Sequence, residues 1–336
     1  MSKFSLSVLQ RRVFPFVGSD DPDIVLGATF GEDAALTRIG DEILASHVDP
    51  IVGAIGDIGR LAVHVACNDI ATAGIAPRWL LLLVLVPRIE DEELLEQIMR
   101  DAAGAAREVG AGIIGGHTGY SAGLTRPLVA VTALGTASGR KPVLTGGAEI
   151  GDLVLVTKGI ALEGTAILAQ DFADVAREKG LSEKDLAEGR AVMAAVSVVP
   201  EALALSEQGV TAMHDVTRGG LLEALLEIAH LSKVGIEVDG NRLPIPPVVT
   251  RFAEAFPFDP LRMISSGTLA VTVPPDRADG ASRALKRLGT PSAYVGRVVE
   301  GQGVRLVRDG TAARFTEIRC EEDELARLWA LHPRSG

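Results

Sequence analysis

The aliphatic run Leu80–Val86, set between Trp79 and Pro87, is the feature that most constrains how this chain folds. The run is far too short to span a bilayer, which takes about 20 residues of helix. A short apolar run next to a proline is typical of a fully buried strand. The run therefore predicts a buried strand in place of a membrane span.

Short β-like runs alternate with amphipathic helical stretches over the rest of the chain, which predicts a mixed α/β (α+β) fold. In the first half we expect strands at 43–48, 78–86, 111–115 and 127–134, and helices at 57–73 and 91–109. In the second half we expect strands at 153–156, 210–213, 235–238, 268–273 and 293–298. Helices are expected there at 161–172, 183–196, 219–230 and 276–288, with one short helix in 240–260 and a helical rhythm in 321–331.

A polar, glycine-rich turn from Thr145 to Asp152 precedes an apolar strand and marks a change in the composition of the chain. We therefore place a domain boundary near residue 147. The predicted domains are 1–147 and 148–336, and a chain of 336 residues is long enough for two cores.

Composition limits the classes of function. Hydrophobic residues make up 47% and aromatic residues only 4%, so the core must be built from Ala, Val, Leu and Ile. The net charge of −11 argues against nucleic acid or an anionic membrane as the partner. The two cysteines, Cys67 and Cys320, cannot form a disulfide framework or a cysteine-rich metal site. The segment MSKFSLSVLQRRVF lacks the apolar stretch of a signal peptide, which predicts a cytoplasmic protein.

Four acidic clusters lie at turn-like positions: Glu32-Asp33, Asp49, Asn68-Asp69 and Asp215. Crowded carboxylates repel one another, so a fold that brought them together would need cations. Mg²⁺ held against substrate phosphates is the usual solution. Two of the clusters also have simpler explanations, because Glu32-Asp33 can be a solvated turn and Asp49 can belong to an Asp-Pro turn.

Asn68-Asp69 is the most informative cluster, because it interrupts a run of small apolar residues typical of a helix packed on a sheet. A charged side chain there is costly unless it is paired or bound to metal. Nearby, His64 is more simply explained as a core histidine and Cys67 as a small buried residue.

Two glycine-rich segments complete the set of candidates. In Gly115–Gly119 (GGHTG) paired glycines after a strand let the backbone approach a ligand, although a plain glycine turn is the alternative, and the pattern is not a P-loop. The segment HDVTRGGL, 214–221, joins a predicted strand to a predicted helix. Thr217 or Asp215 can cap that helix, and its N-terminus beside Arg218 can also hold an anion.

Four strings in this order resemble the aminoimidazole-ribonucleotide (AIR) synthase superfamily: GEDAAL (31–36), NDIATAG (68–74), GGHTG (115–119) and HDVTRGGL (214–221). The superfamily contains AIR synthase (PurM), thiamine-monophosphate kinase (ThiL), selenophosphate synthetase (SelD) and the hydrogenase maturation factor HypE. The resemblance covers residues 31–298 and is greatest to HypE-like proteins.

The resemblance implies a PurM-like subunit of two domains, whose N-terminal sheets pair across a homodimer into a β-barrel. It implies ATP and Mg²⁺ as cofactors, with metal ligands at Asp33, Asp49, Asp69 and Asp215. It implies catalytic roles for Asp69, Asp215 and His117, and a nucleotide and substrate cleft shaped by Asn68, Gly116, His117, Thr118, Arg218 and Gly219. The shared chemistry is activation of an oxygen by phosphorylation, which depends mainly on positioning and charge neutralisation.

The chain also departs from the family pattern. It ends in LHPRSG, without the terminal cysteine of HypE, and Glu32 replaces the first aspartate of the usual GDDAA. We therefore expect an ATP-dependent enzyme with another acceptor, either a small molecule or a protein tail. One alternative is a small-molecule kinase like thiamine-monophosphate kinase, with which the GEDAA loop and the strand at 77–87 are compatible. The other is a dimeric paralogue that binds nucleotide without turnover.

Overall fold

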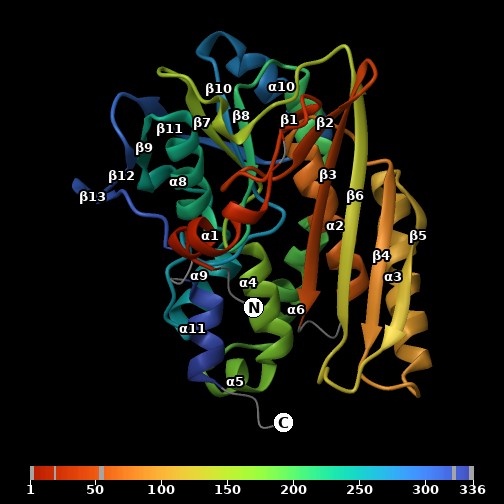
Figure 1. Ribbon diagram of the computed structural model, residues 1–336. Helices are drawn as coiled ribbons and strands as arrows, with labels where there is room; N and C mark the ends of the chain where they lie inside the picture. The colour runs from red at the N-terminus through yellow and green to blue at the C-terminus, as the bar shows by residue number, and fades with distance from the viewer. Residues whose placement is uncertain (1–3, 19, 53–56, 320–322, 333–336) are drawn as a thin grey trace. The chain divides into compact units, whose positions relative to one another are not determined.

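The computed structural model describes residues 4–18, 20–52, 57–319 and 323–332 (Figure 1). The chain divides into two compact units. The β1–β6 unit consists of Ser19–Gly27 and Asp33–Pro142, and the β7–β13 unit consists of Met1–Gly18, Ala28–Glu32 and Val143–Gly336. Cys320 and the first residues of the acidic run after it lie outside the described residues.

The β1–β6 unit is built on one sheet with the strand order β1-β2-β3-β6-β4-β5. Neighbouring strands are antiparallel except β4 and β5, which are parallel. The strands are β1 (Ile24–Leu26), β2 (Ala35–Ile39), β3 (Glu42–Val52), β4 (Trp79–Val86), β5 (Gly112–Tyr120) and β6 (Leu128–Ser138).

Helices α2 (Ile58–Thr72) and α3 (Glu92–Val109) pack against each other and against this sheet, where Figure 1 shows them on the same side. Small residues let α2 approach its neighbours closely. A Cβ atom on Gly59 of α2 would lie 2.2 Å from the carbonyl oxygen of Ile98 on α3, so only glycine fits there. Helix α3 ends at Gly110 in the left-handed conformation (φ 73°), as the sequence predicts.

Strand β4 corrects the expectation of a fully buried strand. Leu81 and Leu83 are 38% and 36% exposed. Every second residue of the strand is buried, namely Leu80, Leu82, Val84 and Val86. The helices cover only one face of the sheet, and β-strand side chains alternate between faces. The other face, which we call the open face, also exposes Val48 of β3.

Two strands extend further than predicted, and candidate site residues therefore lie within them. Strand β3 continues to Val52, so Asp49 lies within it instead of after it. Strand β5 contains the whole GGHTG segment, which the sequence placed at a strand end. Its register with β4 shifts near Leu80–Leu81, and Gly116 (φ 143°) is so close to β4 that a Cβ would lie 1.9 Å from the carbonyl oxygen of Leu82.

The β7–β13 unit contains a second sheet with the strand order β13-β12-β9-β11-β7-β10-β8. Its pairs are antiparallel except β9 with β12. The strands are β7 (Leu153–Thr157), β8 (Ala212–Asp215), β9 (Gly235–Asp239), β10 (Leu269–Val273), β11 (Ser292–Val299), β12 (Gly303–Arg308) and β13 (Thr311–Phe315).

Helices provide the rest of this unit and two apolar clusters. The first cluster lies between the sheet and α8 (Gly220–Ser232), and includes Val154, Leu225 and Ile236. The second is formed by α4 (Leu162–Asp171), α5 (Ala173–Glu178), α6 (Glu183–Ala191), α9 (Pro247–Ala255) and α11 (Glu324–Leu331). The remaining helices are α1 (Leu6–Arg12), α7 (Val199–Ser206) and α10 (Ala278–Leu288).

Within the described part of the chain, no single helix is long and apolar enough to cross a membrane. One bent pair, Glu183–Ala195 with Val199–Ser206, passes by length and composition alone.

Candidate functional site

In the β1–β6 unit, an ion pair links strand β3 to helix α2. The Nε2 atom of His47 lies 3.1 Å from Oδ2 of Asp69, and the Asp69 side chain is only 9% exposed. His47 and Asp49 are two residues apart on β3, so both point to the face that α2 covers. His47 has no recognisable motif, and sequence analysis missed it. The i, i+2 spacing from Asp49 in a strand was the available signal.

Helix α2 carries Cys67, Asn68 and Asp69, all of which are buried. Burial raises the pKa of the Cys67 thiol to about 12, and the negative charge of Asp69 adds to the shift. The thiol is therefore protonated and unreactive at neutral pH. His64, on the same helix, lies 3.2 Å from Glu108 Oε2 of α3, which agrees with its interpretation as a core histidine.

The residues of the GGHTG segment are divided between the two faces of the sheet. His117 pairs with Leu83 on β4 and therefore lies on the open face, whereas Thr118 pairs with the buried Val84 on the helix-covered face. His117 and Asp69 are thus on opposite faces of one sheet, and the chain does not bring these two predicted catalytic residues together.

The carboxylate of Glu32 binds backbone N–H groups of the β7–β13 unit. Its Oε2 accepts a hydrogen bond of 3.0 Å from the backbone N–H of Thr145, and its Oε1 accepts one of 3.1 Å from Gly146. Both carboxylate oxygens thereby tie residues 28–32 to the turn before β7. Asp33 follows directly in the chain and leads into β2.

The HDVTRGGL segment folds as a strand, a tight turn and a helix, with Asp215 as the last residue of β8. Gly219 (φ 79°) and Gly220 (φ 67°) both adopt the left-handed conformation, and a Cβ on Gly220 would lie 2.4 Å from the carbonyl oxygen of Leu261. The N-cap of α8 is Gly219, without a side-chain cap. The expectation that Thr217 or Asp215 caps the helix is therefore wrong, because the glycine turn separates both from the first helical turn.

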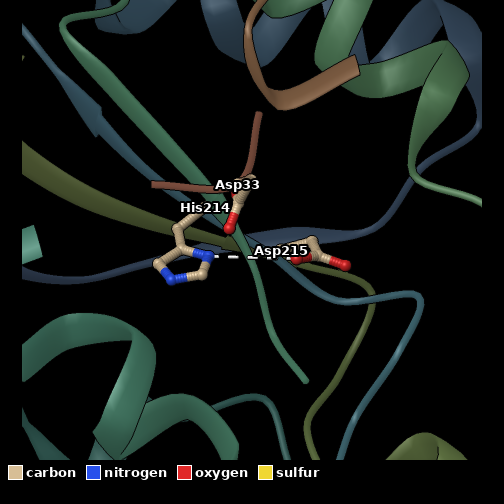
Figure 2. Close-up of side chains that lie close together, drawn as sticks. All are labelled: Asp33, His214 and Asp215. Carbon is tan, nitrogen blue, oxygen red and sulfur yellow. Dashed lines mark ion pairs between the residues drawn. The ribbon is translucent and has the colours of Figure 1, made fainter. Parts of the chain in front are cut away.

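His214 and Asp215 on β8 are buried, at 3% and 1% exposure, and Figure 2 shows both side chains. The Nε2 atom of His214 lies 2.6 Å from Oε2 of Glu227 on α8. Its Nδ1 atom lies 3.8 Å from Oδ1 of Asp215, the pair marked by the dashed line. Glu227 was missed by sequence analysis because it lies 13 residues from His214. Figure 2 also labels Asp33, which belongs to the other unit.

A second charged cluster surrounds Arg218. Its Nη1 atom lies 3.6 Å from Oδ2 of Asp323, which caps α11 by accepting a hydrogen bond from Ala326 N–H. Glu163, in the first turn of α4, is buried close by. Burial raises the pKa of the Glu163 carboxyl, while a hydrogen bond from Ser266 and the charge of Arg218 partly oppose that shift.

These positions define what each unit offers chemically. The β1–β6 unit presents carboxylates from β3 and α2, and the β7–β13 unit presents Asp215, His214 and a cationic arginine at the start of α8. Buried carboxylate oxygens are the ligands that Mg²⁺ takes up in proteins, so the donor set fits this ion. A glycine turn at a helix N-terminus next to arginine favours an anion such as phosphate.

Comparison with known proteins identifies the family. Residues 31–137 match the AIR synthase related protein, N-terminal domain, and residues 149–309 match the AIR synthase related protein, C-terminal domain. The chain therefore belongs to the AIR synthase related proteins, and the HypE-like, PurM-like resemblance of its motifs is confirmed.

Among the relatives is a putative hydrogenase expression/formation protein of Methanocaldococcus jannaschii, 30% identical over 281 residues, with 79% of this chain and 78% of the relative covered. Carbamoyl dehydratase HypE of Escherichia coli is 30% identical over 285 residues, with 81% of each chain covered. The crystal structure of E. coli HypE matches with a TM-score of 0.72 at 26% identity over 82% of this chain and 85% of that one.

A crystal structure of hydrogenase maturation protein HypE in complex with ATP has the same fold, with a TM-score of 0.72 at 24% identity. It covers 89% of this chain and 91% of that one. These matches confirm the predicted two-domain α/β fold.

Proposed function

We propose that this protein is an Mg-ATP-dependent enzyme that activates an oxygen atom of an acceptor by phosphorylation. The observation that carries the proposal is a pair of buried aspartates, Asp69 and Asp215, one in each of the two family domains. A buried carboxylate is costly without a compensating cation, so these positions are suited to binding a metal. The named activity of the HypE relatives, carbamoyl dehydratase, supports an enzyme, and the ATP complex of HypE supports the nucleotide.

We assign the metal ligands to Asp33, Asp49, Asp69 and Asp215, because carboxylate oxygens suit Mg²⁺. When bound, Mg²⁺ would neutralise the charge of the ATP phosphates. His47 holds one oxygen of Asp69, and this contact fixes the direction of the carboxylate. Arg218 and Gly219, at the start of α8, would bind phosphate or acceptor anion through a side-chain cation and backbone N–H groups. We assign Asn68, Gly116 and Thr118 to the cleft that binds the nucleotide and the substrate.

Calorimetric titration of ATP with Mg²⁺ tests the site, using the wild type and the variants Asp69→Asn and Asp215→Asn. We expect each substitution to weaken ATP binding by at least about tenfold, because even the loss of a residue that only orients a metal ligand costs about 10–100-fold in metal affinity. Asp276→Asn is the matched control, because that side chain is 75% exposed in the β7–β13 unit and should leave affinity unchanged. Equal ATP affinity in all four proteins would refute the assignment.

Release of ADP separates the proposed enzyme from its alternatives. ADP production that depends on a carbonyl- or carboxamide-bearing acceptor supports the proposal. Stimulation by thiamine monophosphate alone would favour the kinase alternative, and tight ATP binding without ADP under any acceptor would favour the non-catalytic paralogue.

We further propose a cytoplasmic homodimer in which domain 1–147 provides ATP binding and dimerisation, and domain 148–336 completes the subunit. The support for a dimer is the open face of the β1–β6 sheet, which exposes Val48, Leu81 and Leu83. An apolar sheet face of this kind is typical of a protein interface. His117 lies on the same face, so a second copy would bury it.

A further inference from the structure

Four charged side chains lie in one row across the outer strands of the β7–β13 sheet. Arg297 of β11 is paired with Glu237 of β9, and Glu237 is paired with Arg305 of β12. Arg305 is in turn paired with Arg314 of β13. Residues paired across neighbouring strands project from the same face of a sheet, and we call these four residues the arginine row. Val304, next to Arg305, belongs to the buried cluster with α8, so the arginine row lies on the other face.

The arginine row carries an excess of positive charge. Its three arginines and one glutamate give a net charge of +2, whereas the whole chain carries −11. The one carboxylate is already engaged, because Oε1 of Glu237 lies 2.8 Å from Nη1 of Arg305. Arg305 and Arg314 are directly opposite each other, and like charges in this arrangement destabilise a sheet. An anionic group on the far side of Arg314 would offset that repulsion.

The arginine row ends on an edge strand. Strand β13 is the last in the strand order, and within the described residues only β12 pairs with it. Figure 1 shows β13 at the outer end of this sheet. The backbone N–H and C=O groups on its outer side therefore have no strand partner in the described part of the chain. Groups of this kind are a template on which another strand can pair.

The free edge and the arginine row together specify a partner. A strand added beside β13 would continue the row by one strand spacing, about 4.8 Å, and would place a side chain opposite Arg314. We propose that β13 is a docking edge for an extended acidic segment of a partner protein, which adds as a strand and sets a glutamate or aspartate opposite Arg314. Backbone hydrogen bonds would supply the affinity, and the contact with arginine would supply the selectivity.

The acidic character of the whole chain is compatible with such a partner. At physiological ionic strength, exposed charges more than about 8 Å apart are largely screened, so the arginine row dominates the field at this edge. The competing explanation is that Arg314 only protects a short edge strand against pairing, since charged residues serve that purpose in many sheets. That explanation predicts that no peptide adds to β13.

Titration of the whole ¹⁵N-labelled chain with three capped peptides, followed by nuclear magnetic resonance, tests this inference. The probe is Thr-Val-Glu-Val-Glu-Val-Thr. A second peptide has lysine in place of both glutamates, and a third, Thr-Val-Glu-Pro-Glu-Val-Thr, keeps the charge but has a proline that cannot donate to a strand ladder.

We expect the probe to shift the amide resonances of residues 311–315. It should bind about 2–30-fold more tightly than the lysine peptide, because opposite charges across two strands are favourable and like charges are unfavourable by comparable amounts. The proline peptide should bind at least about tenfold more weakly than the probe. Arg314→Glu should reverse the preference between glutamate and lysine. Arg308→Glu is the matched control, because it makes the same change of charge in the same hairpin on the opposite face and should leave the preference unchanged.

The wild-type titration is decisive even if a variant fails to fold. No shift at 311–315 with the probe at millimolar concentration, or equal binding of the glutamate and lysine peptides, would overturn the inference. Equal binding of the proline peptide would also overturn it, because the arginine row would then attract any anion without strand addition. Self-association of the protein that is lost in Arg314→Glu would overturn it too, since a second copy would then occupy the edge.

Discussion

The buried ion pair between Lys158 and Glu201 allows a quantitative test of how the β7–β13 unit is held together. The Nζ atom of Lys158 lies 2.6 Å from Oε1 of Glu201 and donates to the carbonyl oxygens of Ala195, at 2.9 Å, and Ser197, at 2.5 Å. These contacts use all three ammonium protons. The side chains are only 14% and 2% exposed, so the pair joins the end of β7 to α7 largely away from water.

The size of the expected change in the free energy of unfolding follows from the cost of burying charged groups away from water. Burial lowers the pKa of Lys158 and raises that of Glu201, so each group depends on its partner to remain charged. Glu201→Gln leaves a buried ammonium without its counter-ion and should lower the free energy of unfolding by about 3–5 kcal/mol. The double variant Lys158→Met with Glu201→Leu removes both charges, and its cost should be within about 1 kcal/mol of zero or favourable.

Urea unfolding at pH 7 of the wild type, Glu201→Gln, the single variants Lys158→Met and Glu201→Leu, and the double variant measures this coupling. Lys184→Met is the control, since Lys184 forms an exposed pair with Glu188 at 3.9 Å and should contribute about 0–1 kcal/mol. A cost below about 1 kcal/mol for Glu201→Gln would refute the reasoning, as would a double variant as unstable as the sum of the single ones.

Three further predictions test other parts of the structure. Gly59→Ala should destabilise the protein by about 1–3 kcal/mol in chemical unfolding, because its Cβ would meet the Ile98 carbonyl, whereas Gly104→Ala on α3 has room and should be neutral or stabilising. Glu163→Gln should reduce the loss of thermal stability as pH rises from 4.5 to 8. Burial raises the folded-state pKa of Glu163, so the folded form keeps a proton that the unfolded form releases as pH rises. Leu83→Lys should shift a dimer to monomer in analytical ultracentrifugation, and an unchanged mass would contradict an interface on the open face.

Sequence patterns predicted elements well where local and tertiary preferences agree. Helix α2 was expected at 57–73 and is found at Ile58–Thr72, because its small apolar residues suit both a helix and close packing. Strand β5 was expected to end at Gly115, but pairing with β4 continues the strand through Gly116–Gly119 to Tyr120, although glycine disfavours strands. Strands β12 and β13 were missed, since their exposed, charged residues resemble a loop until they pair.

In the candidate site, too, local motifs could be predicted from the sequence whereas tertiary contacts could not. The positions of Asp69 and Asp215 on a helix and at a strand end could be predicted from motif context. Their partners could not, because His47 and Glu227 come from elements that only tertiary packing brings near. Glu32 lies in the same acidic loop motif as Asp33. Both oxygens of its carboxylate nevertheless accept hydrogen bonds from backbone N–H groups.

The central claim is that carboxylates of this chain hold ATP through a divalent metal ion. Titrating ATP into the wild-type protein by calorimetry, with Mg²⁺ or Mn²⁺ present and then with the metals removed by chelator, tests it most directly. We predict saturable binding with either metal and a loss of at least about tenfold in affinity without them, because the acidic site then repels the phosphates. ATP binding of equal strength with and without metal, or no binding under any condition, would contradict the account.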